Sequence, residues 1–367
     1  MGRPRLQALE LTGTPRERGV THGATFADEI AANLDRYLDV FEFKGSDEET
    51  VYEQAEAFVP LIADENPAYF EEMQGIAEGS DLQIEDVTIL NARYEVMYSA
   101  FKSEADDLDD TAPLDGCTAF CARPEITADG HTYLGQNWDW VPGIETFVMD
   151  VRRDDAPNMV AMTEAGIVGG KIGVNEHGLG MTLNGLVTEK DGEDPFRKPY
   201  HVRFREVLDS TRMDEAIAPL ITKPRACSAN VILAHADGEM IDFELAPETV
   251  NYLYPEDGLL THANHVEDRT RMNSEFEKLT PSTLFRASRL RRLLATNRGE
   301  IDAEVVMNAF RDHFSKPNSL CSHPDPDDPE LDRSQTNGSF IMDLTDRRFL
   351  GTNGPPCEND YHEFRVA

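Results

Sequence analysis

A glycine followed directly by a cysteine, Gly116-Cys117, is the pair of residues in this chain with the clearest chemical potential. A cysteine thiolate is a strong nucleophile, and the preceding glycine adds no side chain that would obstruct attack on its own carbonyl. If water resolves the adduct, the chain is cut and Cys117 acquires a free α-amine with a pKa of about 8. One residue would then supply both nucleophile and base. Taken alone, the pair also fits a small buried cysteine near a turn.

A second group of reactive residues lies shortly downstream, where residues 134–140 read Leu-Gly-Gln-Asn-Trp-Asp-Trp and contain both tryptophans of the chain. An aspartate between two large aromatic residues favours a carboxylate at the edge of an apolar pocket over one on a solvated surface. Asp139 is therefore a candidate site residue, and Trp138 is a candidate substrate contact. A strand end with packing tryptophans is the alternative.

These residues form a recognisable pattern. Asp-Gly-Cys-Thr-x-x-Cys at 115–121, followed by Gly-Gln-Asn-Trp-Asp, resembles the acyl-coenzyme A:6-aminopenicillanic acid acyltransferase family of N-terminal-nucleophile (Ntn) hydrolases. Four further motifs are similar to those of the family and occur in the same order, so the resemblance extends over nearly the whole chain. They lie at residues 13–23, 90–95, 163–166 and 262–265.

The resemblance implies an α+β fold, a four-layer αββα Ntn-hydrolase sandwich. It also implies self-cleavage into chains 1–116 and 117–367, which remain associated as one domain. The activity expected is hydrolysis or acyl transfer at amide bonds, through a thioester on Cys117. Substrates would be N-acyl amino acids, acylated peptides or penicillin-like amides. No cofactor is expected, although a coenzyme A thioester would serve as an acyl donor.

The resemblance also implies further site residues. Asp139 would orient the new amine or bind substrate, and Asn264 and Asn184 would donate N–H groups to the oxyanion. Hydrogen bonding to their own backbone is the alternative for both asparagines. Three charged residues complete the candidate substrate contacts, although a structural ion pair is an alternative role for the first two: Arg93, Glu95 and Arg333.

One departure from the family affects the substrate. The family often has Ser-x-Cys-Arg where this chain reads Ser-Leu-Cys-Ser at 319–322, so a cation able to hold a carboxylate or a cofactor phosphate is missing. This weighs against penicillin-type and coenzyme A substrates. A hydrolase similar to bile-salt or penicillin V acylases is one alternative function, and a non-catalytic binder of acylated ligands is another. Intact Cys117, Asp139 and Asn264 argue against the binder.

Charge limits the partners. The chain has 69 acidic and 34 basic residues, a formal net charge of −35. Such a protein repels nucleic acids and anionic membranes, so a small acylated molecule is the expected partner. Carboxylates spread along the chain favour a halophilic host, with an acidic mesophilic protein as the alternative. There is no apolar run of about 20 residues and no apolar signal core, which makes the cytoplasm the default location.

The five cysteines form an odd set without the spacing of a disulfide framework, and free thiols are the expected state. A zinc site could be assembled from Cys321-x-His323 and His262-x-x-His265. Neither spacing is that of a structural zinc site, so no metal is expected.

Hydrophobic periodicity divides the chain in two. Residues 1–102 should be mainly helical after a short opening strand, with one helix ending at Pro60 and another beginning at Asn66-Pro67. The acidic segment 103–116 should be exposed and mobile, which suits the upstream side of a cleavage site. Pro324 to Asp332 should form an exposed loop. After Cys117 we expect strands at 118–122, 131–136, 147–151, 159–163, 178–186, 230–235, 240–245 and 339–344, and helices near 200–221, 282–295 and 302–313.

Overall fold

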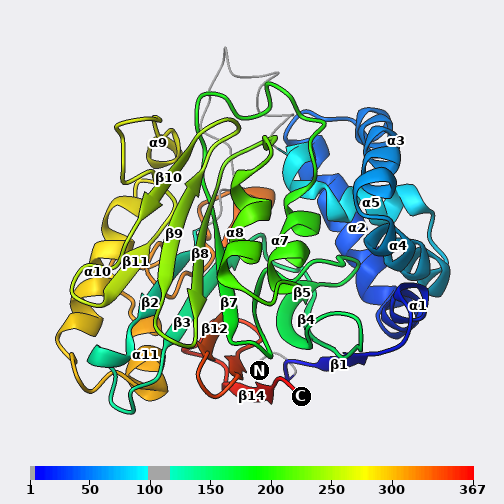
Figure 1. Ribbon diagram of the computed structural model, residues 1–367. Helices are drawn as coiled ribbons and strands as arrows, with labels where there is room; N and C mark the ends of the chain where they lie inside the picture. The colour runs from blue at the N-terminus through cyan, green and yellow to red at the C-terminus, as the bar shows by residue number, and fades with distance from the viewer. Residues whose placement is uncertain (1–4, 98–115) are drawn as a thin grey trace.

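The computed structural model describes residues 5–97 and 116–367, and it arranges them as two β-sheets packed against each other (Figure 1). The larger sheet has the strand order β1-β4-β5-β6-β7-β8-β9-β10, and the smaller has the order β11-β2-β3-β12-β13-β14. Strand β7 packs on β2 and β3 across the interface between them. Most of the acidic segment predicted to be mobile, 103–115, lies outside the described residues.

The strands are short and mostly antiparallel; β1, which pairs parallel to β4, is the exception among the ladders of the described residues. Those of the larger sheet are β1 (Ala8–Leu11), β4 (Thr146–Val151), β5 (Met159–Glu164), β6 (Ile172–Asn175), β7 (Leu179–Gly185), β8 (Ala229–His235), β9 (Met240–Leu245) and β10 (Val250–Leu253). Those of the smaller sheet are β2 (Thr118–Ala122), β3 (Tyr133–Trp140), β11 (Leu259–His262), β12 (Gln335–Asp343), β13 (Arg348–Gly351) and β14 (His362–Arg365).

Helices cover the outer face of each sheet. On the larger sheet α7 (Tyr200–Leu208) packs against β6 and β7, and α8 (Met213–Ile221) packs on α7. On the smaller sheet α10 (Thr283–Ala295) packs against β2 and β11, and α11 (Ala303–Phe310) packs against β12. The short α9 (Phe276–Leu279) precedes α10, and single 3-10 turns lie at Pro124–Ile126 and Glu330–Asp332. The predicted four-layer αββα sandwich is therefore confirmed.

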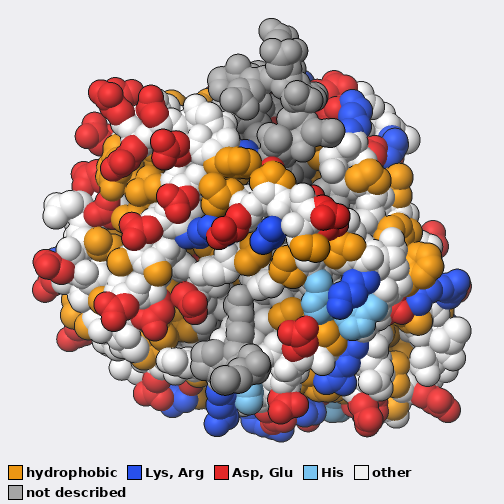
Figure 2. All heavy atoms as spheres, turned by 180° about the vertical axis from the view of Figure 1, so that it is seen from behind, with side chains coloured by type: hydrophobic (Ala, Val, Ile, Leu, Met, Phe, Trp, Pro, Cys, Tyr) orange, Lys and Arg blue, Asp and Glu red, His pale blue; other side chains and the backbone are white. Residues whose placement is uncertain are grey.

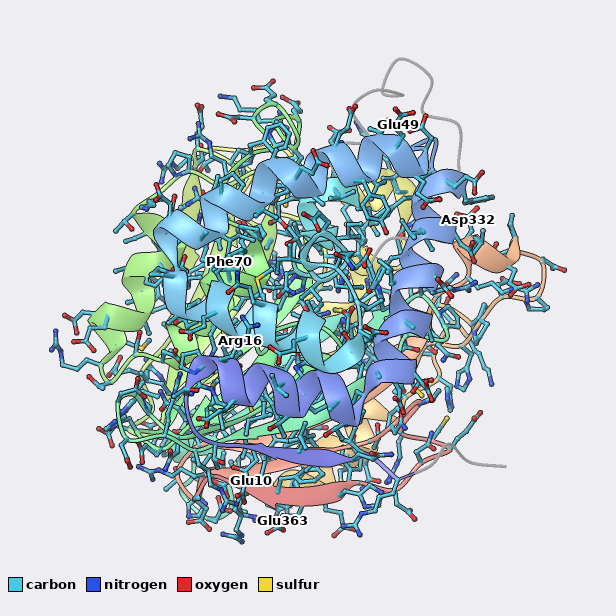
Figure 3. All side chains as sticks on the ribbon, turned by 90° about the vertical axis from the view of Figure 1, so that its right-hand side faces the viewer. Glu10, Arg16, Glu49, Phe70, Asp332 and Glu363 are labelled. Atoms are coloured by element: carbon cyan, nitrogen blue, oxygen red, sulfur yellow. The ribbon has the colours of Figure 1, made fainter. Side chains whose placement is uncertain are left out.

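Five further helices of the described residues gather on one side of the sandwich (Figure 3). They are α1 (Pro15–Thr25), α2 (Ala27–Phe43), α3 (Glu48–Glu65), α4 (Pro67–Ser80) and α5 (Ile84–Asn91). Helices α1 and α4 lie so close that a β-carbon added to Gly19 would come within 2.0 Å of the carbonyl oxygen of Glu72. A glycine is therefore required at this position of the 13–23 motif, because a larger residue would push the helices apart.

The helix that was predicted to end at Pro60 does not end there. Helix α3 continues through Pro60 to Glu65. Proline removes one backbone donor and crowds the preceding turn, which usually costs several kcal/mol in a helix interior. Here Phe58 before the proline and Ile62 after it are both fully buried, so tertiary packing on both sides of Pro60 keeps the helix continuous.

The strands expected from the sequence are all present, with boundaries that differ by a few residues. Strand β2 has the predicted bounds and is buried at every position, because one of its faces contacts the larger sheet and the other contacts α10. The five strands that were not predicted, β6, β10, β11, β13 and β14, are four residues long, too short for a clear alternating pattern.

The surface carries carboxylates over its whole visible extent. Figure 2 shows acidic side chains scattered across one face of the molecule, with no single patch that holds most of them. Among the helices in residues 5–97 and 116–367, none combines the length and the hydropathy needed to cross a membrane.

Candidate active site

The peptide bond between Gly116 and Cys117 lies at the entry to β2, next to the buried face of α10. Arg286, only 1% exposed, reaches from α10 to this peptide. Its Nη1 donates to the carbonyl oxygen of Gly116, to that of Cys117 at 2.5 Å, and to Oγ1 of Thr118 at 2.8 Å. A guanidinium in this position withdraws electron density from the Gly116 carbonyl, which makes its carbon a better electrophile.

The thiol of Cys117 points to the opposite side of the strand, into the apolar layer between the sheets. It is fully buried, and its Sγ lies 3.7 Å from the backbone oxygen of Asp139 on the neighbouring strand β3. Strand β2 begins one residue after Cys117 and pairs with β3 from Thr118 and with β11 from Ala119. The nucleophile proposed from the sequence thus lies directly before the two ladders that fix β2.

The carboxylate of Asp139 lies directly beside Gly116. A β-carbon built on Gly116 would come within 2.9 Å of Oδ2 of Asp139, so a residue with a side chain would collide with the carboxylate. Its other oxygen, Oδ1, accepts a hydrogen bond of 2.6 Å from Oγ1 of Thr336 on β12. A carboxylate at this distance would hold the ammonium form of an N-terminus created at Cys117.

The apolar pocket predicted beside Asp139 is not found. Successive side chains of a strand point to opposite faces, so Trp138 and Trp140 enter the apolar layer between the sheets while Asp139 faces a polar cavity. The ring of Trp138 instead lies under the ammonium of Lys171, 4.8 Å from its centroid.

Asn264, predicted as an oxyanion donor, is brought to the same place by Arg286. Its Oδ1 accepts 2.7 Å from Nη2 of Arg286, and its Nδ2 donates 3.0 Å to the carbonyl oxygen of Gly185 at the end of β7. Its backbone N–H donates to Oγ1 of Thr283. Because Arg286 holds the oxygen of the amide, the NH2 group is oriented away from the guanidinium.

Asn184 lies beside Gly185 but is engaged differently. Its Nδ2 donates 2.8 Å to Oδ1 of Asn230 on β8, and it lies 3.5 Å from the carbonyl oxygen of His262. Asn230 in turn donates to Asp242. His262 completes this buried polar group, and the nearby carboxylate of Asp242 together with a hydrogen bond to Glu244 raises the pKa of its imidazole to about 10 against the effect of burial.

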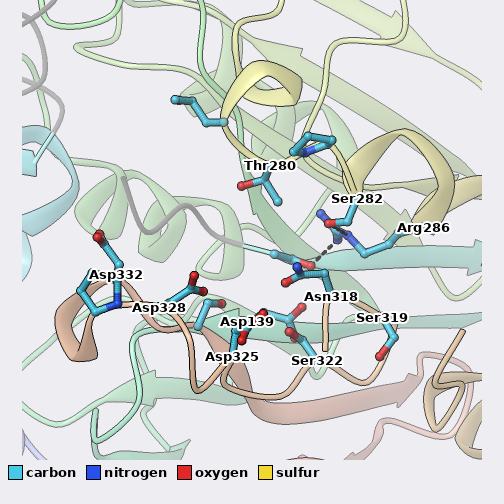
Figure 4. A pocket seen from close by; sticks show the side chains of 15 residues that line it. Asp139, Thr280, Ser282, Arg286, Asn318, Ser319, Ser322, Asp325, Asp328 and Asp332 are labelled. Atoms are coloured by element: carbon cyan, nitrogen blue, oxygen red, sulfur yellow. Dashed lines mark hydrogen bonds between the residues drawn. The ribbon is translucent and has the colours of Figure 1, made fainter. Parts of the chain in front are cut away.

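A cavity of about 260 Å³ opens onto Gly116 and Asp139 (Figure 4). Arg286 is the one cationic side chain among the described residues that line it. Burial together with the carboxylates of Asp325 and Asp332 raises the pKa of Asp328, so the negative charges act on one another. The lining side chains that decide its character are Asp139, Asp325 and Asp328 on one side, together with Asp332, which is paired with Nζ of Lys44 at 2.6 Å, and Thr280, Ser282, Ser319 and Ser322 around them.

The remaining candidate contacts lie elsewhere. Arg93 binds Glu164 on β5 through hydrogen bonds of 3.0 and 2.5 Å, and its guanidinium stacks on Trp140. Glu95 accepts a hydrogen bond from the backbone N–H of Tyr200. Arg333 donates to two carbonyl oxygens of the loop that precedes it. None of the three charged candidates is among the described residues that line the cavity.

The family-like motifs outside the site connect the N-terminal helices to the larger sheet. The amide of Asn91 donates to the carbonyl oxygen of Gly166 and accepts from the backbone N–H of Val168. His22 accepts from the backbone N–H of Gly166, and burial lowers the pKa of its imidazole to about 3, so it stays neutral in this role. These motifs hold the turn after β5 in place.

Comparison with known proteins identifies the family of the chain. The model of the family described as acyl-coenzyme A:6-aminopenicillanic acid acyl-transferase matches residues 126–328, which is more than half of the chain. The chain belongs to this family. It is therefore an enzyme of an acyltransferase family, and the family predicted from its motifs is confirmed.

Individual relatives of this family member are distant. The chain is 26% identical over 314 residues to the 40 kDa form of acyl-coenzyme A:6-aminopenicillanic-acid-acyltransferase from Emericella nidulans, covering 84% of this chain and 82% of the relative. Two solved structures are similar in part. One is the Caenorhabditis elegans ortholog of N-acylethanolamine-hydrolyzing acid amidase (15% identity, 62% of this chain, 93% of that chain, TM-score 0.47). The other is a variant of the conjugated bile acid hydrolase from Clostridium perfringens (13% identity, 68% and 97%, TM-score 0.46).

Two residues at the candidate site of this acyltransferase-family chain were missed by sequence reasoning. Arg286 had a readable signal, because it shares the buried face of α10 with Leu290 and Leu294, where an arginine needs a specific partner. Thr336 had none. Its role depends on the pairing of β12 with β3, which brings it opposite Asp139 from almost 200 positions away.

Glu95 leads to a prediction about pH. Burial raises the pKa of its carboxyl from 4.5 to about 8, against the opposing hydrogen bond from Tyr200. A carboxyl whose pKa is raised by folding contributes stability that is fully present below about pH 4.5 and is lost as the pH rises through about 8. We therefore expect Glu95→Gln to melt at an increasingly higher temperature than the parent as the pH is raised from 5 to 8.

Thermal melting of both proteins at a series of pH values measures this difference. Glu363, an exposed residue of β14, provides the matched control, because Glu363→Gln removes one carboxylate of the same type from the surface. If the difference in melting temperature between Glu95→Gln and the parent does not change with pH, the raised pKa of Glu95 is contradicted.

Proposed function

We propose that this chain is a self-processing cysteine enzyme that cuts itself between Gly116 and Cys117 and then cleaves the amide bond of a small acylated substrate. One observation carries the proposal: Arg286 donates a hydrogen bond to the carbonyl oxygen of Gly116, whose carbon is the atom the adjacent thiol must attack. The family contains acyltransferases, which supports the chemistry but not a particular substrate.

The first reaction is an intramolecular acyl shift. Sγ of Cys117 attacks the Gly116 carbonyl carbon, and the tetrahedral oxyanion receives hydrogen bonds from the Arg286 guanidinium. Breaking the carbon–nitrogen bond leaves a thioester on the sulfur and a free α-amine on Cys117. Water then hydrolyses the thioester, so the acid of Gly116 is released and the thiol is regenerated. The two resulting chains, 1–116 and 117–367, stay associated through shared layers of the fold.

The second reaction uses the groups released by the first. The α-amine of Cys117 has an ordinary pKa of about 8, so it can accept the thiol proton near neutral pH. Asp139 stabilises the ammonium form of this amine from the side where Gly116 stood. Asn264 is our proposed oxyanion donor for the substrate, since its NH2 group is neutral and is oriented by Arg286. Water or an amine then takes the acyl group from Cys117.

The cavity limits the substrate. Gly116 is on the acyl side of the bond that is cut, so the cavity next to it receives the acyl part of a substrate. Its aspartates repel anions, and Ser322 stands where the family often has an arginine. We propose an acyl group that is uncharged or cationic at its far end. This disfavours a carboxylate-bearing acyl group, and the same charges disfavour a coenzyme A thioester as donor.

Trapping the acyl-enzyme tests the proposed function. Purified protein would be mixed with an aliphatic N-acyl amide of a chromogenic amine, quenched in acid and digested. We expect mass spectrometry to find the acyl group on the peptide that begins at Cys117. A known thiol hydrolase treated in the same way is the positive control, since its thioester should survive the acid quench. If the control is trapped and the amide is turned over, but no acyl group is found on Cys117, the covalent mechanism is refuted.

The preference for charge is measurable with matched substrates. Amides of one chromogenic amine with 6-aminohexanoate, hexanoate or hexanedioate have acyl groups of similar length that end in an ammonium, a methyl or a carboxylate. We expect kcat/KM to fall by about tenfold or more from the ammonium to the carboxylate, which corresponds to about 1.4 kcal/mol of electrostatic discrimination.

A variant of the cavity identifies the source of that preference. Asp328→Asn removes a carboxylate of the lining, while Asp327→Asn removes an equally exposed carboxylate of the same loop that does not line the cavity. Only Asp328→Asn should reduce the ratio of kcat/KM for the ammonium-bearing amide to kcat/KM for the carboxylate-bearing amide. Raising the salt concentration should reduce it as well, because salt screens the interaction. A preference for the hexanedioate amide would contradict the proposed substrate class.

We further propose that the protein works at high ionic strength. With 69 acidic and 34 basic residues, repulsion between dispersed carboxylates destabilises the folded state at low salt. The melting temperature should therefore rise as KCl is increased from about 0.1 to 3 M, with most of the change at the lower concentrations where the screening length shortens fastest. A melting temperature that stays flat or falls over this range would be inconsistent with a halophilic protein.

A further inference from the structure

Two histidines and two cysteines meet outside the cavity, in the loop that follows α11 and the segment that follows β13. The four ligand atoms of His313, Cys321, His323 and Cys357 all lie within 4.8 Å of one another. Cys321 and Cys357 are 36 positions apart in the sequence. The sequence also offers His262 and His265 as partners of Cys321 and His323, but His262 instead contacts Glu244.

Four of the six distances between the ligand atoms are close to the edges of a tetrahedron around a metal ion, and the two from His313 to the sulfurs are within 4.8 Å. Sγ of Cys321 and Sγ of Cys357 are 3.5 Å apart, and Nε2 of His313 and Nε2 of His323 are 3.1 Å apart. Nε2 of His323 lies 3.7 Å from the Cys321 sulfur and 3.4 Å from that of Cys357. Tetrahedral zinc, with bonds of about 2.3 Å to sulfur and about 2.0 Å to nitrogen, gives edges of about 3.8 Å (S–S), 3.3 Å (N–N) and 3.5 Å (S–N).

The surroundings of His323 agree with a metal ligand. Its Nε2 faces the other three ligand atoms, and its Nδ1 lies 3.7 Å from Oε1 of Glu358. Histidines bound to zinc commonly turn their second ring nitrogen to a carboxylate, which fixes the ring and makes it a better donor. Two thiolates and two neutral imidazoles leave no position open, which is the pattern of a structural rather than a catalytic zinc site.

We propose that His313, Cys321, His323 and Cys357 bind one zinc ion that fastens the wall of the active-site cavity to the C-terminal segment. Ser319 and Ser322, on either side of Cys321, line the cavity. The backbone N–H of Ser322 donates 2.9 Å to Oγ1 of Thr336, which donates to Asp139. The metal would therefore hold in place the loop that positions this carboxylate beside Gly116.

Metal analysis of the full protein tests the site directly. Protein produced with zinc in the medium and purified without chelators should contain about one zinc ion per chain. Protein in which cobalt(II) replaces zinc should show the visible absorption of a tetrahedral cobalt–thiolate centre. Stripping the metal with a chelator should lower the melting temperature, and zinc but not magnesium should restore it.

Substitution separates this site from other thiols. Cys357→Ser should lose the zinc and the cobalt spectrum, whereas Cys227→Ala, which changes a buried cysteine elsewhere, should keep both. If Cys357→Ser fails to fold, the chelator experiment on the unaltered protein still decides. A folded protein that binds neither zinc nor cobalt overturns the proposal. So does a disulfide between Cys321 and Cys357, seen as a mass lower by two hydrogens.

Discussion

Cys117→Ala is expected to leave the protein as a single chain of 41.1 kDa with no amidase activity. Without the thiol there is no nucleophile for the Gly116 carbonyl, and the α-amine that acts as the base never forms. The parent should instead yield two chains, the second beginning Cys-Thr-Ala-Phe. Intact-mass measurement and N-terminal sequencing, both in molar salt, distinguish these outcomes.

Cys121→Ala is the matched control for this result. Cys121 lies on the same strand, faces the same apolar layer and is equally buried, so its replacement removes a thiol without touching the scissile peptide. We expect this variant to be cut and active. If the parent is active on an amide while its chain remains uncut, the self-cleavage mechanism must be abandoned.

Arg286→Met is expected to slow self-cleavage by about a hundredfold or more, which is the usual cost of losing one oxyanion donor. The methionine fills much of the space of the arginine but donates no hydrogen bond to the carbonyl of Gly116. The rate can be followed as the disappearance of the uncut chain after synthesis in a cell-free system. Arg286→Lys keeps the charge but not the geometry of the guanidinium, so its rate of self-cleavage should lie between those of the parent and Arg286→Met.

Slower cleavage could also result from misfolding of the Arg286→Met protein, so the stability of the fold must be measured separately. Arg291→Met is a suitable control, because Arg291 lies on the same helix but forms an exposed ion pair with Glu256. The melting temperatures should be compared in the Cys117→Ala background, where no variant can be cut. Unchanged cleavage in a folded Arg286→Met protein would show that another group stabilises the oxyanion.

Local sequence patterns predicted much of this fold. The family motifs indicated the αββα sandwich, and local strand signals predicted β2 and β9 with their observed bounds. The same reasoning failed at Pro60, where contacts of Phe58 and Ile62 outweigh a local helix breaker. It also failed for five of the six four-residue strands in the described part of the chain, because so short a strand has too few positions to show a hydrophobic period.

The candidate site was also predictable only in part, because some of its residues meet only through the tertiary fold. Gly116, Cys117 and Asp139 belong to short motifs that can be read from adjacent residues. Thr336 reaches Asp139 only through the pairing of β12 with β3, and no spacing in the sequence reveals it. The prediction that Asp139 lies at the edge of an apolar pocket was wrong, because its two aromatic neighbours on the strand point to the other face.

The pairing of β1 with β4 has a consequence for the processed protein. Strand β1 precedes the cut and β4 follows it, so the larger sheet would be completed across two separate polypeptides. The uncut precursor folds as one molecule, whereas the mature pair, once unfolded, must find its partner by diffusion at a rate set by concentration. Cleavage would therefore turn a reversible fold into one preserved mainly by the slowness of its unfolding.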